Sequence, residues 1–244
     1  MREREELIYQ TIAGTLLAGR LAPGSQLVEA RLAQIFGVTR ERVRKVLHRL
    51  GHERLLDVIV NRGAFVASPT FAEAREIYEA RRIVEGGIAG RLAGRLTAVQ
   101  AAALRVHAKR ELAALKRGDR AVSIRLSGEF HILLAEFTGS GFVLRELQEL
   151  VSRTSMLVAF FEPAAASACA CEEHGEILRA LLDTDTGLAI KSMHTHLSLI
   201  ETRLVPRVAT TNSTVDPAME LRRAWSLAAK TMRKQRRAAT AHAR

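Results

Sequence analysis

Three histidines, His131, His174 and His196, could together bind a metal ion. Each falls on a different predicted helix, and helical bundles build metal sites from histidines that project inward from separate helices. His194 precedes His196 by two residues, about 200° around a helix, so we expect it to point elsewhere. Taken singly, such histidines are more often ordinary core or surface residues, and that alternative stays open.

An antiparallel bundle of helices would carry these histidines. Beyond Pro69, aliphatic residues recur every three or four positions, which is the spacing of an amphipathic helix. Short Gly, Thr or Asp turns separate the segments, so successive helices should be antiparallel. The predicted helices lie near 71–93, 97–116, 119–137, 141–161, 167–183 and 186–205, with a further one over about 217–234.

The first 68 residues have the pattern of a winged helix-turn-helix. Apolar periodicity predicts three helices, and two short apolar strands follow around a turn sequence. A helix-turn-helix places the start of its second helix in the major groove of DNA. The predicted elements are helices over 7–17, over 28–36 and from an N-cap at Thr39 towards Gly51, and strands over 57–60 and 64–67 around Asn61-Arg62-Gly63.

The third of these helices has a strongly cationic outer face. Arg40 and Arg44 lie one turn apart there, and an arginine can donate two hydrogen bonds to a guanine edge. Thr39 and the nearby backbone amides could hold a phosphate, and Arg31 could reach the same edge or the backbone. Arg62 lies where a wing reaches the minor groove. The alternative is a cationic helix that only keeps the protein soluble.

Composition and charge limit the possible functions. The 244 residues include 37 Lys and Arg against 26 Asp and Glu, and 48% are hydrophobic, so the chain should fold around a core. Residues 1–66 carry a net charge of +4 and residues 205–244 carry +7 around a neutral body, and the second run could equally be a solvated tail. Cys169 and Cys171 are poorly spaced for a disulfide. With no signal peptide or membrane-spanning run in the sequence, we expect a cytoplasmic protein.

The N-terminal segment contains the motifs Leu21-Ala-Pro-Gly, Leu27-Val-Glu, Leu32-Ala33, Gly37-Val-Thr-Arg40, Val43-Arg44, Leu47, Leu50 and Arg62-Gly63-Ala64-Phe65-Val66. Over residues 7–68 they resemble the DNA-binding domain of the GntR family of bacterial regulators. The resemblance implies that Arg31, Arg40 and Arg44 contact the operator and that Gly63 is the wing tip. At Glu41-Arg42 many members have Thr-Pro; here Glu41 could accept a hydrogen bond from a cytosine amino group or repel phosphate.

The predicted bundle contains Glu-Phe-His-Ile-Leu-Leu around His131, then Glu173-His174-Gly-Glu-Ile-Leu and His196-Leu197. Over residues 71–205 these resemble the metal-binding pattern of the FadR-type subfamily, whose effector domain is called FCD. In its metal-binding members an Asp, or sometimes Asn, stands four residues before the first histidine, where this chain has Ser127. Glu129 lies on the wrong helical face to replace it. A neutral three-histidine site favours zinc or nickel, with water or an effector oxygen completing the shell.

A small carboxylate would be the natural effector for such a site. Its oxygens can occupy open metal positions, and a nearby arginine can hold the rest of the anion. Arg81, in Glu-Ala-Arg-Arg-Ile-Val-Glu, resembles the first-helix arginine that faces the pocket in relatives, and Ser127 would lie in the same pocket. A surface ion pair between Arg81 and Glu85 one turn later is the alternative.

The sequence therefore predicts a mostly α protein with three parts. These are a winged helix-turn-helix at 1–68, an all-α FCD-type effector-binding and dimerisation domain at 69–235, and a basic tail without regular structure at 236–244. We predict a transcriptional regulator, most often a repressor in this family. It would bind a palindromic double-stranded DNA operator as a homodimer, because one winged helix reads only a half-site.

Two other classes compete with this interpretation. A metal-dependent hydrolase fused to a DNA-binding module would need a general base, and none is evident beside the candidate ligands. A non-specific DNA-coating protein fits poorly with a neutral body that contains a possible ligand site.

Overall fold

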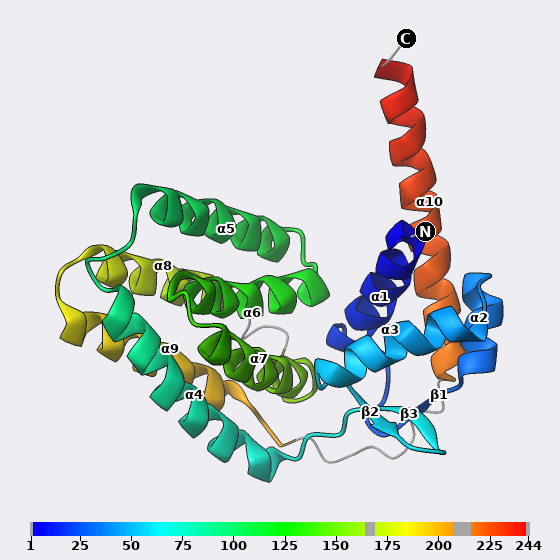
Figure 1. The fold of residues 1–244 in the computed structure, drawn as a ribbon, viewed down its shortest axis with the longest axis horizontal. Coiled ribbons are helices and arrows are strands. Elements are labelled where there is room, and N and C mark those ends of the chain that lie inside the picture. Colours follow the sequence, from blue (N-terminus) through cyan, green and yellow to red (C-terminus); the bar gives the residue numbers. More distant parts are fainter. Residues whose placement is uncertain (1, 164–168, 207–215, 243–244) are drawn as a thin grey trace. The chain divides into compact units, whose positions relative to one another are not determined.

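The structure is a computed structural model that describes residues 2–163, 169–206 and 216–242. Within these residues it contains ten helices and one three-stranded sheet, in agreement with the predicted mostly α fold (Figure 1). The chain divides into two compact units, one formed by residues 1–68 with 210–244 and the other by residues 69–209. The described helices are too short or too polar to cross a membrane.

The first unit contains the predicted winged helix-turn-helix. Its three helices pack around fully buried aliphatic and aromatic side chains such as Ile12, Phe36 and Leu50. The strands form an antiparallel sheet in the order β1-β3-β2, of which the two-residue β1 was not predicted. The elements are α1 (Arg2–Leu17), β1 (Gln26–Leu27), α2 (Glu29–Phe36), α3 (Arg40–His52), β2 (Leu56–Ile59) and β3 (Gly63–Val66).

Residues with positive φ shape two turns of this unit: the turn that leads into α3, and the wing, which is the turn between β2 and β3. Gly37 ends α2 in the left-handed conformation, with φ of 61°, so the chain can turn sharply into α3. Thr39 takes the predicted N-cap position of α3, although its side chain makes no capping hydrogen bond. At the wing, Asn61 and Gly63 have φ of 61° and 100°, which are conformations that asparagine and glycine tolerate best.

The last helix, α10 (Pro217–His242), belongs to the first unit and packs against α1 and α2. Leu221 is fully buried, and the Trp225 ring meets the Phe36 ring edge-on at 5.0 Å between centroids. The Arg4 guanidinium lies 6.0 Å from the Trp225 ring centroid, and Arg31 donates two hydrogen bonds to the Asp216 carboxylate. An apolar stripe therefore attaches α10 to the winged helix.

This arrangement differs from the predicted domains. We expected 217–234 to lie within an effector domain that extends to 235, and no regular structure over 236–244. The helical backbone instead continues to His242, while residues 243–244 lie outside the described residues. Periodicity reveals that a helix has an apolar face, but it does not reveal which partner covers that face.

Leu221→Ala is expected to destabilise the first unit by about 2–5 kcal/mol, because a fully buried leucine leaves a cavity. Trp225 is the single tryptophan of the chain and lies on the same helix, so its fluorescence during urea unfolding reports on this unit. Met219, 68% exposed on α10, provides the control, and Met219→Ala should shift stability by less than about 0.5 kcal/mol. Similar unfolding of both variants would mean that α10 does not pack as described.

The second unit is the predicted helical bundle. Five of its six helices start within one residue of the predicted positions and at a polar N-cap, such as Thr70, whose hydroxyl accepts from the amide of Glu73. The predicted start of the fifth helix at 167 lies outside the described residues. The helices are α4 (Phe71–Leu92), α5 (Ala98–Lys116), α6 (Arg120–Phe137), α7 (Gly141–Phe161), α8 (Cys169–Leu182) and α9 (Thr186–Arg203).

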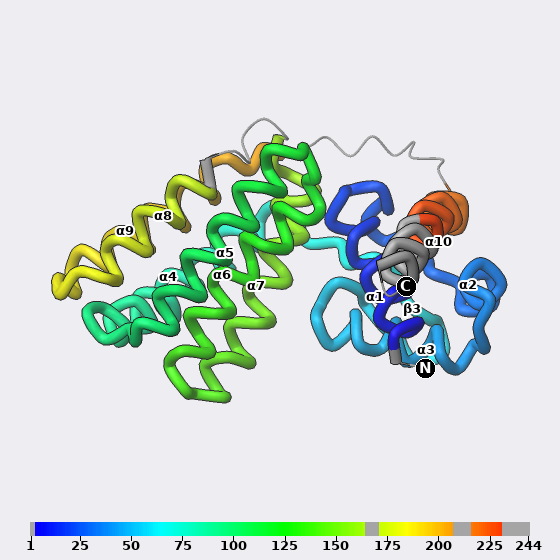
Figure 2. The backbone as a smooth tube through the Cα atoms, turned by 90° about the horizontal axis from the view of Figure 1, so that it is seen from above, coloured from blue at the N-terminus to red at the C-terminus, as the bar shows by residue number. Residues whose placement is uncertain are grey.

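The core of the bundle determines which residues face inward. Figures 1 and 2 show α5, α6 and α7 lying side by side, and α4 packs against both α7 and α9. Large buried side chains, among them Tyr78, Phe130 and Met193, fill the centre. At Gly86 a Cβ atom would lie 2.4 Å from the His194 ring, so the missing side chain allows α4 and α9 to approach closely. This packing brings the inward faces of α4, α6, α8 and α9 together.

Candidate metal centre and nucleic-acid interface

The structure brings the three candidate metal ligands together. His131 on α6, His174 on α8 and His196 on α9 are all buried, and one ring nitrogen from each lies within 4.8 Å of the others. Nε2 of His196 is 3.1 Å from Nε2 of His174 and 3.2 Å from Nε2 of His131. His194 lies away from this cluster, where its Nε2 donates to the Arg82 carbonyl at 3.0 Å.

A carboxylate meets the other nitrogen of each ring. Nδ1 of His131 contacts Glu85 on α4, Nδ1 of His174 lies 2.9 Å from Glu111 on α5, and Nδ1 of His196 lies 2.7 Å from Glu173 on α8. A carboxylate can only accept, so each Nδ1 must carry the proton. The three Nε2 atoms therefore present lone pairs to a common point, as in carboxylate–histidine–metal sites.

These facing lone pairs suit a metal ion better than a proton. Burial lowers the pKa of His131 to about 4 and lowers the pKa of His196 well below its ordinary value, which disfavours imidazolium at neutral pH. Three nitrogens at about 2.0–2.1 Å from a zinc ion lie about 3.3 Å apart in a tetrahedral site and about 3.0 Å apart in an octahedral one. The separations of the His196 Nε2 from the other two nitrogens fall between these values, and all three ligand atoms lie within 4.8 Å of one another, so the three histidines could hold a divalent ion.

Two of the three carboxylates, those of Glu85 and Glu173, also pair with an arginine. Burial raises the pKa of Glu85, but the charges of Arg81 and His131 outweigh this effect and bring it to about 2. The Arg203 guanidinium pairs with Glu173 at the end of α9. Burial beside Glu111 raises the pKa of Cys171 to about 12, so this thiol stays protonated at neutral pH. Glu85 is therefore ionised, and Cys171 is no thiolate donor.

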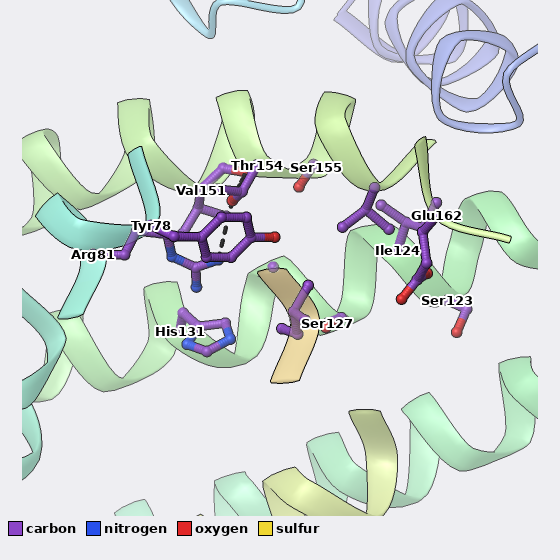
Figure 3. A pocket seen from close by; sticks show the side chains of 13 residues that line it. Tyr78, Arg81, Ser123, Ile124, Ser127, His131, Val151, Thr154, Ser155 and Glu162 are labelled. Carbon is purple, nitrogen blue, oxygen red and sulfur yellow. Dashed lines mark hydrogen bonds between the residues drawn. The ribbon is translucent and has the colours of Figure 1, made fainter. Parts of the chain in front are cut away.

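A pocket adjoins His131 and is lined in part by α4, α6 and α7 (Figure 3). Arg81 is buried there; its Nε donates to Glu85 at 2.6 Å and its Nη1 donates to Thr154 at 3.0 Å. The pair with Glu85 that we considered as a surface interaction does form, but inside the protein. Arg81 Nη2 and the Tyr78 hydroxyl are buried and have no hydrogen-bond partner in the described part of the chain.

Ser127 lines the same pocket one helical turn before His131, and the two side chains appear together in Figure 3. Glu129 instead pairs with Arg125 on the outer face of α6, so it does not replace the missing acidic ligand. Tyr78, Glu111 and the pairing of Glu173 with His196 were not predicted from the sequence. No short-range spacing links these residues to their partners; Glu111, for example, precedes His174 by 63 positions.

The predicted DNA-contacting residues lie on the surface of the first unit. Arg40 is exposed at the start of α3, as are Glu41 and Arg44. Arg44 donates two hydrogen bonds to Glu29 of α2, at 2.9 and 2.8 Å, and these bonds hold the pKa of Glu29 below its usual range. Glu41 pairs with Lys45 at 3.1 Å. The outer face of α3 is therefore cationic but partly neutralised.

The remaining candidates lie at the edges of this face. Arg31 on α2 is paired with Asp216, at 2.6 Å, and Arg42 lies 3.8 Å from Glu5 of α1. Arg62 and Gly63 are exposed at the wing, where the Arg62 carbonyl accepts from the Gln26 side chain at 2.9 Å. The wing is thus fixed to β1 through its backbone, which leaves the Arg62 side chain exposed.

Family models match both units. Residues 4–66 match the model of the bacterial regulatory proteins of the gntR family, and residues 76–199 match the FCD domain. The chain is 24% identical over 196 residues to the HTH-type transcriptional repressor RspR of Escherichia coli, covering 79% of this chain and 85% of that protein. It is 30% identical over 198 residues to an uncharacterised HTH-type transcriptional regulator from an unstable DNA locus of Streptomyces ambofaciens, covering 79% and 81%.

Solved structures show the same fold. McbR/YncC of E. coli matches with a TM-score of 0.67 at 19% identity, over 80% of this chain and 93% of that one. A GntR regulator from Rhodococcus sp. RHA1 also gives 0.67 at 22% identity, over 82% and 96%. The curated relatives are transcriptional regulators rather than enzymes, which removes support for the hydrolase alternative. This chain belongs to the GntR family of bacterial transcriptional regulators, with an FCD domain as its second unit.

Proposed function

We propose that this regulator is a repressor that binds a palindromic operator as a homodimer and senses a small carboxylate at a divalent-metal site. One observation carries the sensing part: buried Arg81 lines the same pocket as His131, and its Nη2 has no hydrogen-bond partner among the described residues. The cationic outer face of α3 supports operator binding. The similarity to RspR, which is named as a repressor, supports repression rather than activation. A single winged helix reads one half-site, so a two-fold dimer would match a palindrome.

Each residue of the site has a distinct task in this proposal. His131, His174 and His196 would hold the ion, and Glu85, Glu111 and Glu173 would fix their ring tautomers. A bound zinc or nickel ion would supply open coordination positions for carboxylate oxygens. Arg81 would donate from Nη2, and Tyr78 from its hydroxyl, to the same anion. Thr154 keeps the Arg81 guanidinium in place through its bond to Nη1.

Binding to the DNA upstream of its own gene tests this function. Fluorescence anisotropy and footprinting should show a symmetric protected site whose half-sites lie about 10 base pairs apart or a multiple of that. Zinc with a mixture of small carboxylates should weaken binding, whereas a scrambled duplex at the same salt should bind poorly throughout. Equal affinity for the upstream and scrambled duplexes would contradict operator recognition, and an unchanged affinity with zinc and carboxylates would contradict sensing.

Glu111→Gln is expected to weaken zinc binding about 10- to 100-fold, because an amide holds the His174 tautomer less firmly than a carboxylate does. Competition with a chelating dye measures this change directly. Glu129→Gln removes a carboxylate from the same unit without touching a histidine, so zinc affinity should stay at the wild-type value. Equal effects of the two substitutions would rule out the orienting role of Glu111.

A further inference from the structure

Acidic residues of the first unit neutralise several of the cations on α2 and α3. The pairs are Arg44 with Glu29, Lys45 with Glu41 and Arg31 with Asp216. Each pair has no net charge, so it lowers the positive potential that this surface presents to DNA. Sequence-independent binding to DNA depends on cations that neutralise phosphates, so the acidic partners weaken that part of the binding.

The last helix, α10, has exposed cations without such partners. Arg222, Arg223 and Lys230 are exposed, and none of them forms an ion pair with another residue that the structure describes. Arg223 and Lys230 are seven residues apart, or nearly two full turns, so they lie on the same face of the helix. In the sequence, residues 217–244 contain eight Lys and Arg against one acidic residue, Glu220. The positive charge of the first unit is therefore concentrated on this helix.

Packing holds α10 against the winged helix-turn-helix. Leu221 is fully buried, and the Trp225 ring contacts the Phe36 ring of α2. Figure 1 shows α10 running beside α1 and α2, which it contacts. Arg223 follows Leu221 by two residues, about 200° around the helix, so it points away from the packed face. The exposed cations are thus presented from a fixed helix, which reduces the entropy lost when they bind a ligand.

The start of α10 lies beside a residue that we predict to contact the operator. Asp216, which precedes Pro217, accepts two hydrogen bonds from Arg31 of α2, at 3.3 and 2.6 Å. Arg222 and Arg223 follow Asp216 by six and seven residues, about 10 Å along the helix axis. Double-stranded DNA carries a negative charge about every 1.7 Å of its axis. Phosphates next to a contact at Arg31 would therefore come within reach of both arginines.

We propose that α10 is a second DNA-binding element, which contacts the phosphates that flank the half-site read by α3 and the wing. The inference rests on the proposed operator binding and adds a sequence-independent contact to it. Both matched domains end before α10, at residues 66 and 199, so the helix is an addition to them. Contacts to phosphates position a protein on DNA without reading its sequence, and exposed cations on one helix face suit that task.

Two duplexes that share one operator separate the flanking contacts from contacts to the half-sites. The short duplex ends at the outer base pair of each half-site, and the long duplex adds about one helical turn of arbitrary sequence on each side. At equal salt, the wild type should bind the long duplex at least about tenfold more tightly. Hydroxyl-radical footprinting on the long duplex should show protected backbone outside both half-sites.

Replacing Arg222 and Arg223 together by alanine should remove most of the advantage of the long duplex. Affinity for the short duplex should change less than about twofold. On the long duplex, the slope of log affinity against log salt should fall by up to about 2, since each phosphate contact contributes about 0.9. The preference for particular bases within the half-sites should stay the same, because phosphate contacts carry no base readout.

Two further variants separate contact with DNA from net charge and from folding. Arg105→Ala with Arg110→Ala removes the same charge from exposed positions on α5 of the second unit, so both duplexes should bind as to the wild type. Arg222→Lys with Arg223→Lys keeps the charge and should keep most of the long-duplex affinity, because a lysine binds phosphate as a point charge. Unchanged Trp225 fluorescence should establish that α10 stays packed in each α10 variant.

Three results would overturn this inference while operator recognition by α3 remained intact. The wild type could bind both duplexes equally, the alanine variant of α10 could bind both as the wild type does, or the α5 variant could lose as much affinity as the α10 variant. Absence of any preference of the wild type for the operator over a scrambled duplex would instead contradict the proposed function. That comparison uses the unaltered chain, so the two failures are distinguishable.

Discussion

His174→Ala should reduce bound zinc from about one equivalent to less than about a tenth, the largest effect that we expect from a single substitution. His174 is fully buried, its Nε2 faces His196 at 3.1 Å, and its ring stacks on Phe130 at 4.1 Å between centroids. Two remaining histidines would give a weak, incomplete site. Elemental analysis of untagged protein after incubation with zinc and acetate, followed by dialysis, measures the occupancy.

The same variant should keep its affinity for the operator but no longer respond to zinc and carboxylate. The reason is that the winged helix-turn-helix belongs to a separate compact unit. His194→Ala serves as the matched control, since His194 lies on the same helix as His196 but donates to the Arg82 carbonyl. Thermal unfolding should establish that both variants are folded. Full zinc occupancy of a folded His174→Ala protein would exclude the three-histidine centre.

Local sequence signals predicted most of the fold. Helix boundaries were close to the structure where polar caps coincide with a change of periodicity, as at Thr70, Thr97 and Ser140. The winged helix-turn-helix was predicted because its turn residues, Gly37 and Asn61, have conformations that few other residues favour. The two-residue strand β1 has too few residues to produce a period, and only its pairing with β3 defines it.

The position of α10 could not be derived from local signals. Leu221 and Trp225 mark an apolar face, yet that face could cover either unit, and the strongly basic end suggested a solvated tail. The contact between the Trp225 and Phe36 rings joins residues that are far apart in the sequence, so only three-dimensional packing defines it. Both the helix and its face were therefore visible in the sequence, while the partner was not.

The candidate site, like α10, could be predicted only in part from the sequence. The three histidines could be predicted because helical spacing and family motifs place them on inward faces. Their carboxylate partners could not, because the register between neighbouring helices decides whether Glu111 on α5 meets His174 on α8. Arg81 illustrates the difference: its pairing with Glu85 one turn away was foreseeable, whereas its burial and its bond to Thr154 depend on how α7 packs against α4.

Arg44→Ala is expected to weaken operator binding by about 1–3 kcal/mol and to relax the preference at one base pair, because an arginine can donate two bonds to a guanine. Arg44 is exposed on α3, where its guanidinium donates two hydrogen bonds to Glu29. DNA must replace these two bonds when it binds Arg44. An ion pair that is exposed to water is weak, so the exchange of Glu29 for DNA should be favourable. Anisotropy titrations on the operator and on its single-base variants measure both effects.

Arg44→Lys and Lys45→Ala separate base reading from charge. Lysine keeps the charge but lacks the planar pair of donors, so Arg44→Lys should lose most of the sequence preference and little of the affinity for random DNA. Lys45 is exposed on the same helix and pairs with Glu41, so Lys45→Ala should weaken all duplexes alike and make the salt dependence shallower. If Arg44→Ala also weakened the operator and random DNA equally, Arg44 would be a phosphate contact, and the bases would be read elsewhere on α3.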